Sequence, residues 1–248
     1  MKYILIAITL LSCHDSARKN SLTISTELLD TIKTRPAKLD AQPLLFEAAF
    51  IKGTTRKVKD ATVNLYGVTI GKLKISSGYI VACDPGHIDE YGIPFTQIFP
   101  KGQFPVQLAI AKVENEEAIA FARINFSEEP VEKWEFALQE GQSPVPVGGK
   151  KMHGYSTDLG LGIFADKDAS SALDKTSLTS LDAALYQEMN KHYHNDWRYN
   201  MHHFGQHNMA VFSSGFGDGY YGNYIGFDAA GKPCRLITDF NVVNWKTK

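Results

Sequence analysis

The chain has 248 residues, 44% hydrophobic and 21% charged, which is enough apolar material for one core but short for two full domains. Its 26 basic and 27 acidic residues give a formal net charge of -1, so there is no electrostatic reason to expect a nucleic-acid backbone as partner. Nucleic-acid binding is therefore disfavoured, and a single domain is the expected organisation.

The N-terminus predicts a signal peptide over residues 1–12. Lys2 supplies a positive start and is followed by an apolar run from Tyr3 to Leu11 that only Thr9 interrupts. A helix of that length spans roughly 14 Å, whereas the hydrocarbon core of a membrane is about 30 Å thick. The run is too short for a stable membrane span, and cleavage is the better interpretation.

The run ends in Leu10-Leu11-Ser12-Cys13, which resembles the bacterial lipobox, where the cysteine thiol receives the lipid before cleavage. An ordinary cleaved signal and a buried N-terminal strand with a chance cysteine are the alternatives. Several acyl chains on Cys13 would anchor the protein stably, since each buried CH₂ contributes roughly 0.8 kcal/mol. We therefore expect a lipoprotein of the bacterial cell envelope, attached to the membrane through Cys13 and facing the periplasm or the exterior.

Residues 13–42 are expected to form the lipidated N-terminus and a tether. This segment is polar, and three apolar residues at helical spacing, Leu28, Leu29 and Ile32, predict one short helix within it. Residues 43–248 are expected to form a single β-rich domain.

Short β-like runs follow one another from Val63 onward, and the first five predict a meander: Val63–Ile70, Leu73–Cys83, Val106–Val113, Ala118–Phe126 and Lys133–Leu138. Three more runs come near the C-terminus: Met209–Ser213, Tyr220–Phe227 and Pro233–Phe240. The alanine-rich, largely apolar faces of the third and fourth runs predict a hairpin covered on both sides. Thr179 and Asp182 form a capping box for a helix that ends near His192. The sequence thus predicts an α+β fold, mainly antiparallel β-sheet with one or two short helices.

Two cysteines, Cys83 and Cys234, are left if Cys13 is modified. An oxidising compartment permits them to pair, and two buried thiols are the alternative. Hydrolysis by Cys83 with His87 is disfavoured, because a reactive thiolate needs a positive, partly exposed setting that Asp84 opposes. The chain also contains no G-x-S-x-G elbow for a serine nucleophile.

Five separated motifs occur in an order that points to a family. They are Cys83-Asp84-Pro85, Gly102–Val106, Asp158–Asp166, Ser214–Gly219 and Thr238-Asp239-Phe240. Together they resemble the bacterial domain of unknown function 4241 over residues 79–240. That family usually has Trp where this chain has Phe216, and a further aromatic residue near Ile225. The resemblance implies a shared fold and allows a shared pocket, and no established activity comes with it.

The glycine-rich motif Ser214–Gly219 is a candidate ligand-binding loop. Gly215, Gly217 and Gly219 occupy every second position, and Asp218 supplies one carboxylate. Such a loop brings backbone N–H groups close to an anionic ligand, while the carboxylate holds a hydroxyl or a cation. A tight connection between two strands is the favoured alternative, because no helix clearly follows to complete a phosphate cradle.

Four aspartates are candidate ligand-binding or acid/base groups: Asp84, Asp158, Asp218 and Asp239. Asp84 and Asp239 each end a strand-like run, where side chains commonly enter a shared cleft, although each also fits a turn cap. Asp158 and Asp166 bracket Gly160 and Gly162, and two carboxylates on neighbouring turns are what a hard cation or a general acid/base pair requires. Asp166, however, immediately precedes a short helical segment and is expected to be its N-cap.

Five histidines between His192 and His207 offer a weaker metal hypothesis. His203 and His207 have the spacing of ligands that share one helical face. No HExxH pattern is present, and the segment lies outside the five motifs. We interpret it as an exposed amphipathic loop, and we expect no cofactor.

The sequence therefore predicts an envelope protein of unknown activity that binds a protein or a small polar ligand through its glycine-rich loop and aromatic neighbours. A hydrolase with an aspartate-based acid/base or metal site is the alternative. A cleft that holds a carboxylate of raised pKa favours the enzyme, whereas separated aspartates that each cap a turn favour binding.

Overall fold

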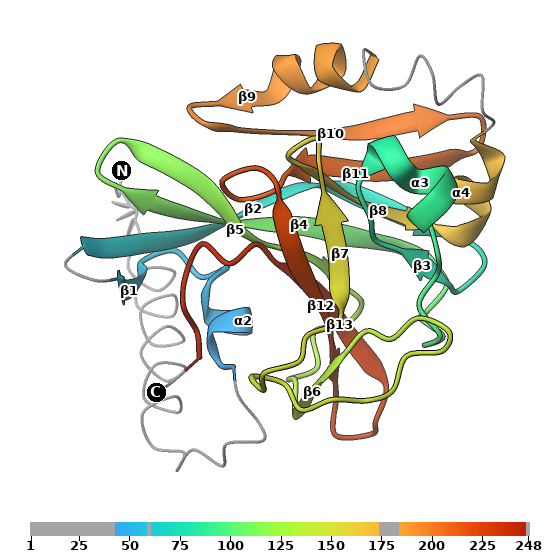
Figure 1. Ribbon diagram of the computed structural model, residues 1–248, viewed down its shortest axis with the longest axis horizontal. Helices are drawn as coiled ribbons and strands as arrows, with labels where there is room; N and C mark the ends of the chain where they lie inside the picture. The colour runs from blue at the N-terminus through green and yellow to red at the C-terminus, as the bar shows by residue number, and fades with distance from the viewer. Residues whose placement is uncertain (1–42, 59–60, 174–183, 247–248) are drawn as a thin grey trace, which may run out of the picture. The chain divides into compact units, whose positions relative to one another are not determined.

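The computed structural model describes residues 43–58, 61–173 and 184–246 (Figure 1). The predicted signal peptide, the lipidation site Cys13 and the tether therefore lie outside the described residues, as do Thr179 and Asp182. Within the described part of the chain, no helix has the length and hydropathy needed to cross a membrane.

The larger of two sheets is antiparallel throughout and has the strand order β1-β2-β4-β5-β13-β12-β6, with β7 also paired to β12. Its strands are β1 (Thr54–Val58), β2 (Ala61–Ile75), β4 (Gly102–Val113), β5 (Glu116–Asn125), β6 (Lys133–Phe136), β7 (Gly154–Thr157), β12 (Gly219–Phe227) and β13 (Pro233–Asp239). The predicted fold class, α+β with mainly antiparallel sheet, is confirmed.

The smaller sheet has the order β3-β8-β11-β10-β9 and packs against the larger one. Its strands are β3 (Ile80–Val81), β8 (Leu161–Asp166), β9 (Tyr193–His194), β10 (Trp197–Phe204) and β11 (His207–Ser213). Leu108 and Ile110 of the larger sheet share one buried cluster with Phe164 and Phe212 of the smaller sheet. Burial of these side chains contributes roughly 1.5–3 kcal/mol each.

Short helices complete the described fold. They are α2 (Leu45–Ala48), the 3₁₀ turn η1 (Pro85–His87), α3 (Ile88–Tyr91), α4 (Lys167–Ala172) and η2 (Asn190–His192). Residues 184–189 are also helical, in agreement with the predicted helix up to His192.

The hairpin β4–β5 is apolar on both faces because both faces are covered. Ile119 and Ile124 point to the smaller sheet, whereas Ala120 and Phe121 belong to a second buried cluster under α2. At the centre of this second cluster lies the fully buried Phe46 of α2. Its ring centroid is 4.9–5.5 Å from those of Phe121, Trp134, Tyr224 and Trp245. The predicted two-sided cover of this hairpin is thus confirmed.

Two local predictions are wrong. The expected strand Leu73–Cys83 is interrupted between β2 and β3, where Gly78 has a φ of 86° and the amides of Ser76 and Ser77 donate to Asp166. The histidine-containing segment is not an exposed loop, because β10 pairs with β11 and Trp197 is buried. A half-buried strand alternates apolar and polar side chains. In β10 this alternation is hard to recognise from the sequence, because the strand contains histidines and an asparagine.

Candidate functional site

The carboxylate of Asp84 is buried and connects two motifs. Its Oδ1 accepts the Gly86 N–H at 2.8 Å, which caps η1, and its Oδ2 accepts the N–H groups of Asp158 and Leu159 at 2.8 and 3.0 Å. A buried carboxylate that accepts three backbone donors satisfies groups that would otherwise be costly to bury. Asp84 therefore fixes the loop between β7 and β8 onto η1.

The glycine-rich loop Ser214–Gly219 rests on that fixed loop and joins β11 directly to β12. The Ser214 N–H donates to the Gly160 carbonyl at 2.9 Å, and a Cβ added to Gly160 would lie 3.4 Å from the Gly217 Cα. The Gly217 carbonyl accepts from Ser214 Oγ at 2.8 Å and from the Tyr221 hydroxyl at 2.6 Å. Gly215 and Gly217 have φ angles of 53° and 115°, which glycine adopts without strain. The loop is thus a tight connection, held by its own side chains.

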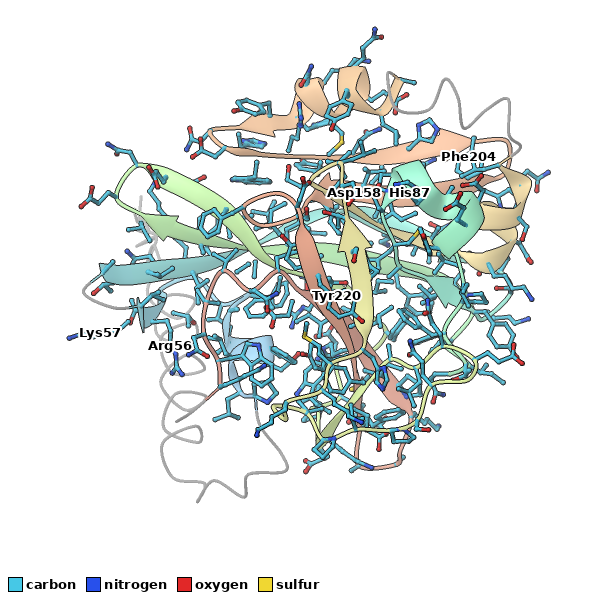
Figure 2. All side chains as sticks on the ribbon, viewed as in Figure 1. Arg56, Lys57, His87, Asp158, Phe204 and Tyr220 are labelled. Carbon is cyan, nitrogen blue, oxygen red and sulfur yellow. The ribbon has the colours of Figure 1, made fainter. Side chains whose placement is uncertain are left out.

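Asp158 and His87 meet at the surface beside this loop (Figure 2). His87 Nε2 lies 3.5 Å from Asp158 Oδ2, and the Asp158 side chain is 76% exposed. An exposed polar contact of this kind contributes little to stability. His87 was expected only as a neighbour of Cys83, so its contact with Asp158 was missed by the sequence reasoning.

Asp239 and Asp218 lie in different settings from Asp84. Asp239 is buried on the sheet face that α2 covers, where it accepts from Trp245 Nε1 at 2.5 Å and from the Asn241 N–H at 2.9 Å. Burial raises the pKa of Asp239 to about 6, against the opposing effect of these two hydrogen bonds. Asp218 is exposed on the glycine-rich loop. The four aspartates are therefore spread over separate settings instead of lining one cleft.

Asp166 is the N-cap of α4, as predicted, because its carboxylate accepts the Asp168 N–H at 2.9 Å. In the described residues, no group of three or more His, Cys, Asp or Glu side chains is placed to hold a metal ion. His203 and His207 lie on opposite strands of the hairpin β10–β11, where their register partners are Asn208 and Phe204. The prediction that they share a helical face is wrong.

Cys83 and Cys234 are free, buried thiols. Burial, with a smaller contribution from Asp84, raises the pKa of the Cys83 thiol well above its ordinary value. Burial likewise raises the pKa of Cys234 to about 11. The thiolate, which is the nucleophile, is therefore disfavoured at both positions.

An apolar groove of about 160 Å³ lies beside the glycine-rich loop. We call it the Phe216 groove, and its lining includes Val58, Ala61, Val113, Glu116, Phe216 and Val242. The Phe216 side chain is 81% exposed although it lines this groove. The sequence did not reveal the groove, because its walls come from strands far apart in the chain. Another pocket, of about 230 Å³, lies between β6 and residues 144–147, away from the five motifs.

These features define a two-sheet α+β protein whose motif residues mostly fix loops and present one exposed aromatic ring. The chain belongs to the family described as protein of unknown function (DUF4241), which matches residues 73–238. The resemblance inferred from the five motifs is thereby confirmed. No curated protein and no solved structure matches the chain.

Replacement of Gly217 tests the backbone requirement of the loop. Gly217→Val is expected to lower the free energy of unfolding by roughly 1–3 kcal/mol, because a β-branched residue is strained at a φ of 115°. Gly219→Val is expected to act differently, through collision of its Cβ with the Tyr221 ring 2.8 Å away. Denaturant unfolding measures both, and Phe216→Ala is the control. Unchanged unfolding of both valine variants would contradict the assigned geometry.

The raised pKa of Asp239 predicts a pH dependence of stability. The folded protein binds this proton more tightly than the unfolded chain, whose ordinary pKa is 3.8, so the contribution of Asp239 is greatest below that pH and is lost as the pH rises through about 6. The difference in unfolding free energy between wild type and Asp239→Asn should therefore fall by up to about 3 kcal/mol between acid and neutral pH. Chemical unfolding across this range measures it, with Asp218→Asn as control. A difference that grows with pH would contradict the assignment.

Proposed function

We propose that this protein is a binding module of the bacterial cell envelope, anchored through Cys13, that recognises a partner protein through the Phe216 groove. The observation that carries the proposal is the exposure of Phe216 beside an apolar hollow. Covering a phenylalanine ring contributes roughly 1.5–3 kcal/mol, and exposed apolar patches next to grooves mark interaction sites. An aromatic anchor of this kind is typical of binding hot spots.

The rigidity of the loop supports the same function. The Gly217 carbonyl accepts hydrogen bonds from the hydroxyl groups of Ser214 and Tyr221, and the Ser214 N–H donates to the Gly160 carbonyl. Phe216 therefore projects from a loop whose backbone is already ordered. Binding through a preorganised loop loses less conformational entropy than binding through a flexible one.

The charge around the groove indicates the chemistry of the partner. Glu114 and Glu116 are exposed at the turn between β4 and β5, and Asp218 is exposed on the glycine-rich loop. Glu117, by contrast, is buried, and its carboxylate accepts hydrogen bonds from Lys112 Nζ and Trp197 Nε1. Of these carboxylates, Glu116 lines the groove and is exposed, which fits a partner segment that carries an apolar side chain next to Lys or Arg.

The setting of the aspartates favours binding over hydrolysis. Asp84 caps η1, Asp166 caps α4, and Asp239 accepts the amide two residues further on. Asp239 has a raised pKa but is sealed under Trp245, so a substrate has no access to it. The envelope location is supported by the apolar run of residues 3–11 and the lipobox-like ending at Cys13.

Site-specific photocrosslinking in the native cell tests the proposal. A photoreactive phenylalanine analogue at position 216 is expected to give one discrete adduct in the membrane fraction, because the partner covers this ring. The adduct should be lost when Glu116→Lys reverses the charge of this groove-lining side chain. The same analogue at the exposed Ile98, which lies outside the groove, is the control. Absence of an adduct at position 216, or identical adducts at both positions, would contradict the proposal.

A further inference from the structure

Two buried arginines lie under α2, outside the Phe216 groove. Arg123 of β5 and Arg235 of β13 have side chains that are 11% and 6% exposed. Between them lies one carboxylate, that of Glu47 from α2. Its Oε1 accepts from Arg123 Nη1 at 2.9 Å and from Arg235 Nε at 3.1 Å, and its Oε2 accepts from Arg235 Nη2 at 3.2 Å. The two guanidinium groups thus hold one carboxylate from two sides. We call Arg123 and Arg235 the arginine clamp.

Both guanidinium groups are held by groups other than Glu47. Arg123 Nε donates to Gln107 Oε1 at 2.9 Å, and the guanidinium lies over the Phe50 ring at 3.8 Å. Arg235 Nη1 donates to the carbonyl of Cys234 at 2.9 Å and to that of Ser127. The clamp is therefore expected to keep its geometry when the Glu47 carboxylate leaves. A site that keeps its shape without its occupant is preorganised for another oxyanion.

The two positive charges of Arg123 and Arg235 share the carboxylate of Glu47. Glu47 is the carboxylate that contacts the two cations, while Glu128 attracts Arg123 from further away and accepts from Asn125 Nδ2 at 3.0 Å. Burial lowers the pKa of Arg123 to about 10, although Glu47 opposes this effect, and Arg235 adds repulsion. The Glu47 side chain is 35% exposed, so its carboxylate has a direct path to water.

A buried acceptor without a donor lies on a residue next to the two arginines in the sheet. Asn125 is the register partner of Arg235 on the neighbouring strand, and it lies two residues from Arg123 on the same face. Among the described residues, its Oδ1 has no hydrogen-bond donor. An oxyanion that carries an O–H group, such as hydrogen phosphate, has a donor to offer this atom.

We infer that Arg123 and Arg235 form an oxyanion-binding site whose resting occupant is the carboxylate of Glu47, and which takes a carboxylate or phosphate group of a ligand when Glu47 turns to solvent. The site is separate from the Phe216 groove and goes beyond the proposed function. Glu47 acts in it as an internal competitor. Phe46, the neighbouring residue, stays in its aromatic cluster throughout, so the exchange involves the Glu47 side chain and not the fold.

Removal of the internal carboxylate tests the site. Glu47→Ala is expected to lower Tm, and inorganic phosphate should restore it more than NaCl of equal ionic strength, because phosphate refills the clamp. The double variants Glu47→Ala with Arg123→Gln and Glu47→Ala with Arg235→Gln should lose this specific rise. Equal effects of phosphate and NaCl on Glu47→Ala would overturn the inference. If the alanine variant does not fold, Glu47→Gln, which keeps the side-chain volume, takes its place under the same criteria.

The competition by Glu47 is tested by titrating the wild-type protein. Its apparent affinity for phosphate should be weaker than that of Glu47→Ala by at least about tenfold, because the competent state is a minor one. Equal affinities would overturn the role of Glu47 as occupant. Acetate in place of phosphate separates the ligand classes: rescue by both assigns the site to carboxylates and phosphates, rescue by phosphate alone assigns it to phosphate groups, and rescue by neither overturns the inference.

Discussion

The carboxylate of Asp84 holds together segments that are far apart in the sequence. By accepting three backbone N–H groups, this buried carboxylate fixes the loop after β7 onto η1, and the glycine-rich loop then rests on Gly160 of that loop. Each buried donor left without an acceptor costs about 1–3 kcal/mol. The arrangement of the motif loops, and with it the position of Phe216, therefore depends on one buried side chain.

This constraint explains why the motifs are rich in aspartate and glycine. The aspartates at buried positions accept backbone donors, as Asp84 and Asp166 do. The glycines permit the close approach of two loops, as at Gly160 and Gly217. Beside these loops, the exposed Phe216 ring lines an apolar groove that also includes the exposed Glu116. Recognition of a partner is the function that these features support best.

Much of the fold followed from residue patterns. The hairpin β4–β5, the strands β12 and β13, and the capping role of Asp166 were predictable because alternation and cap chemistry are local signals. The break between β2 and β3 was not, because it depends on Asp166, about ninety residues away along the chain. Strand β10 was missed because its polar residues hide the alternation. The Phe216 groove and the arginine clamp were missed since both are built by strand pairing that composition does not reveal.

The free energy of unfolding of two matched variants tests most directly whether the motif carboxylates hold loops in place. Asp84→Asn keeps the shape of the side chain but places an amide against N–H donors, so we expect a loss of at least about 2 kcal/mol. Asp158→Asn removes only an exposed carboxylate and should change stability by less than about 0.5 kcal/mol. A stable Asp84→Asn protein would contradict the account, because the motif carboxylates would then be free for another role.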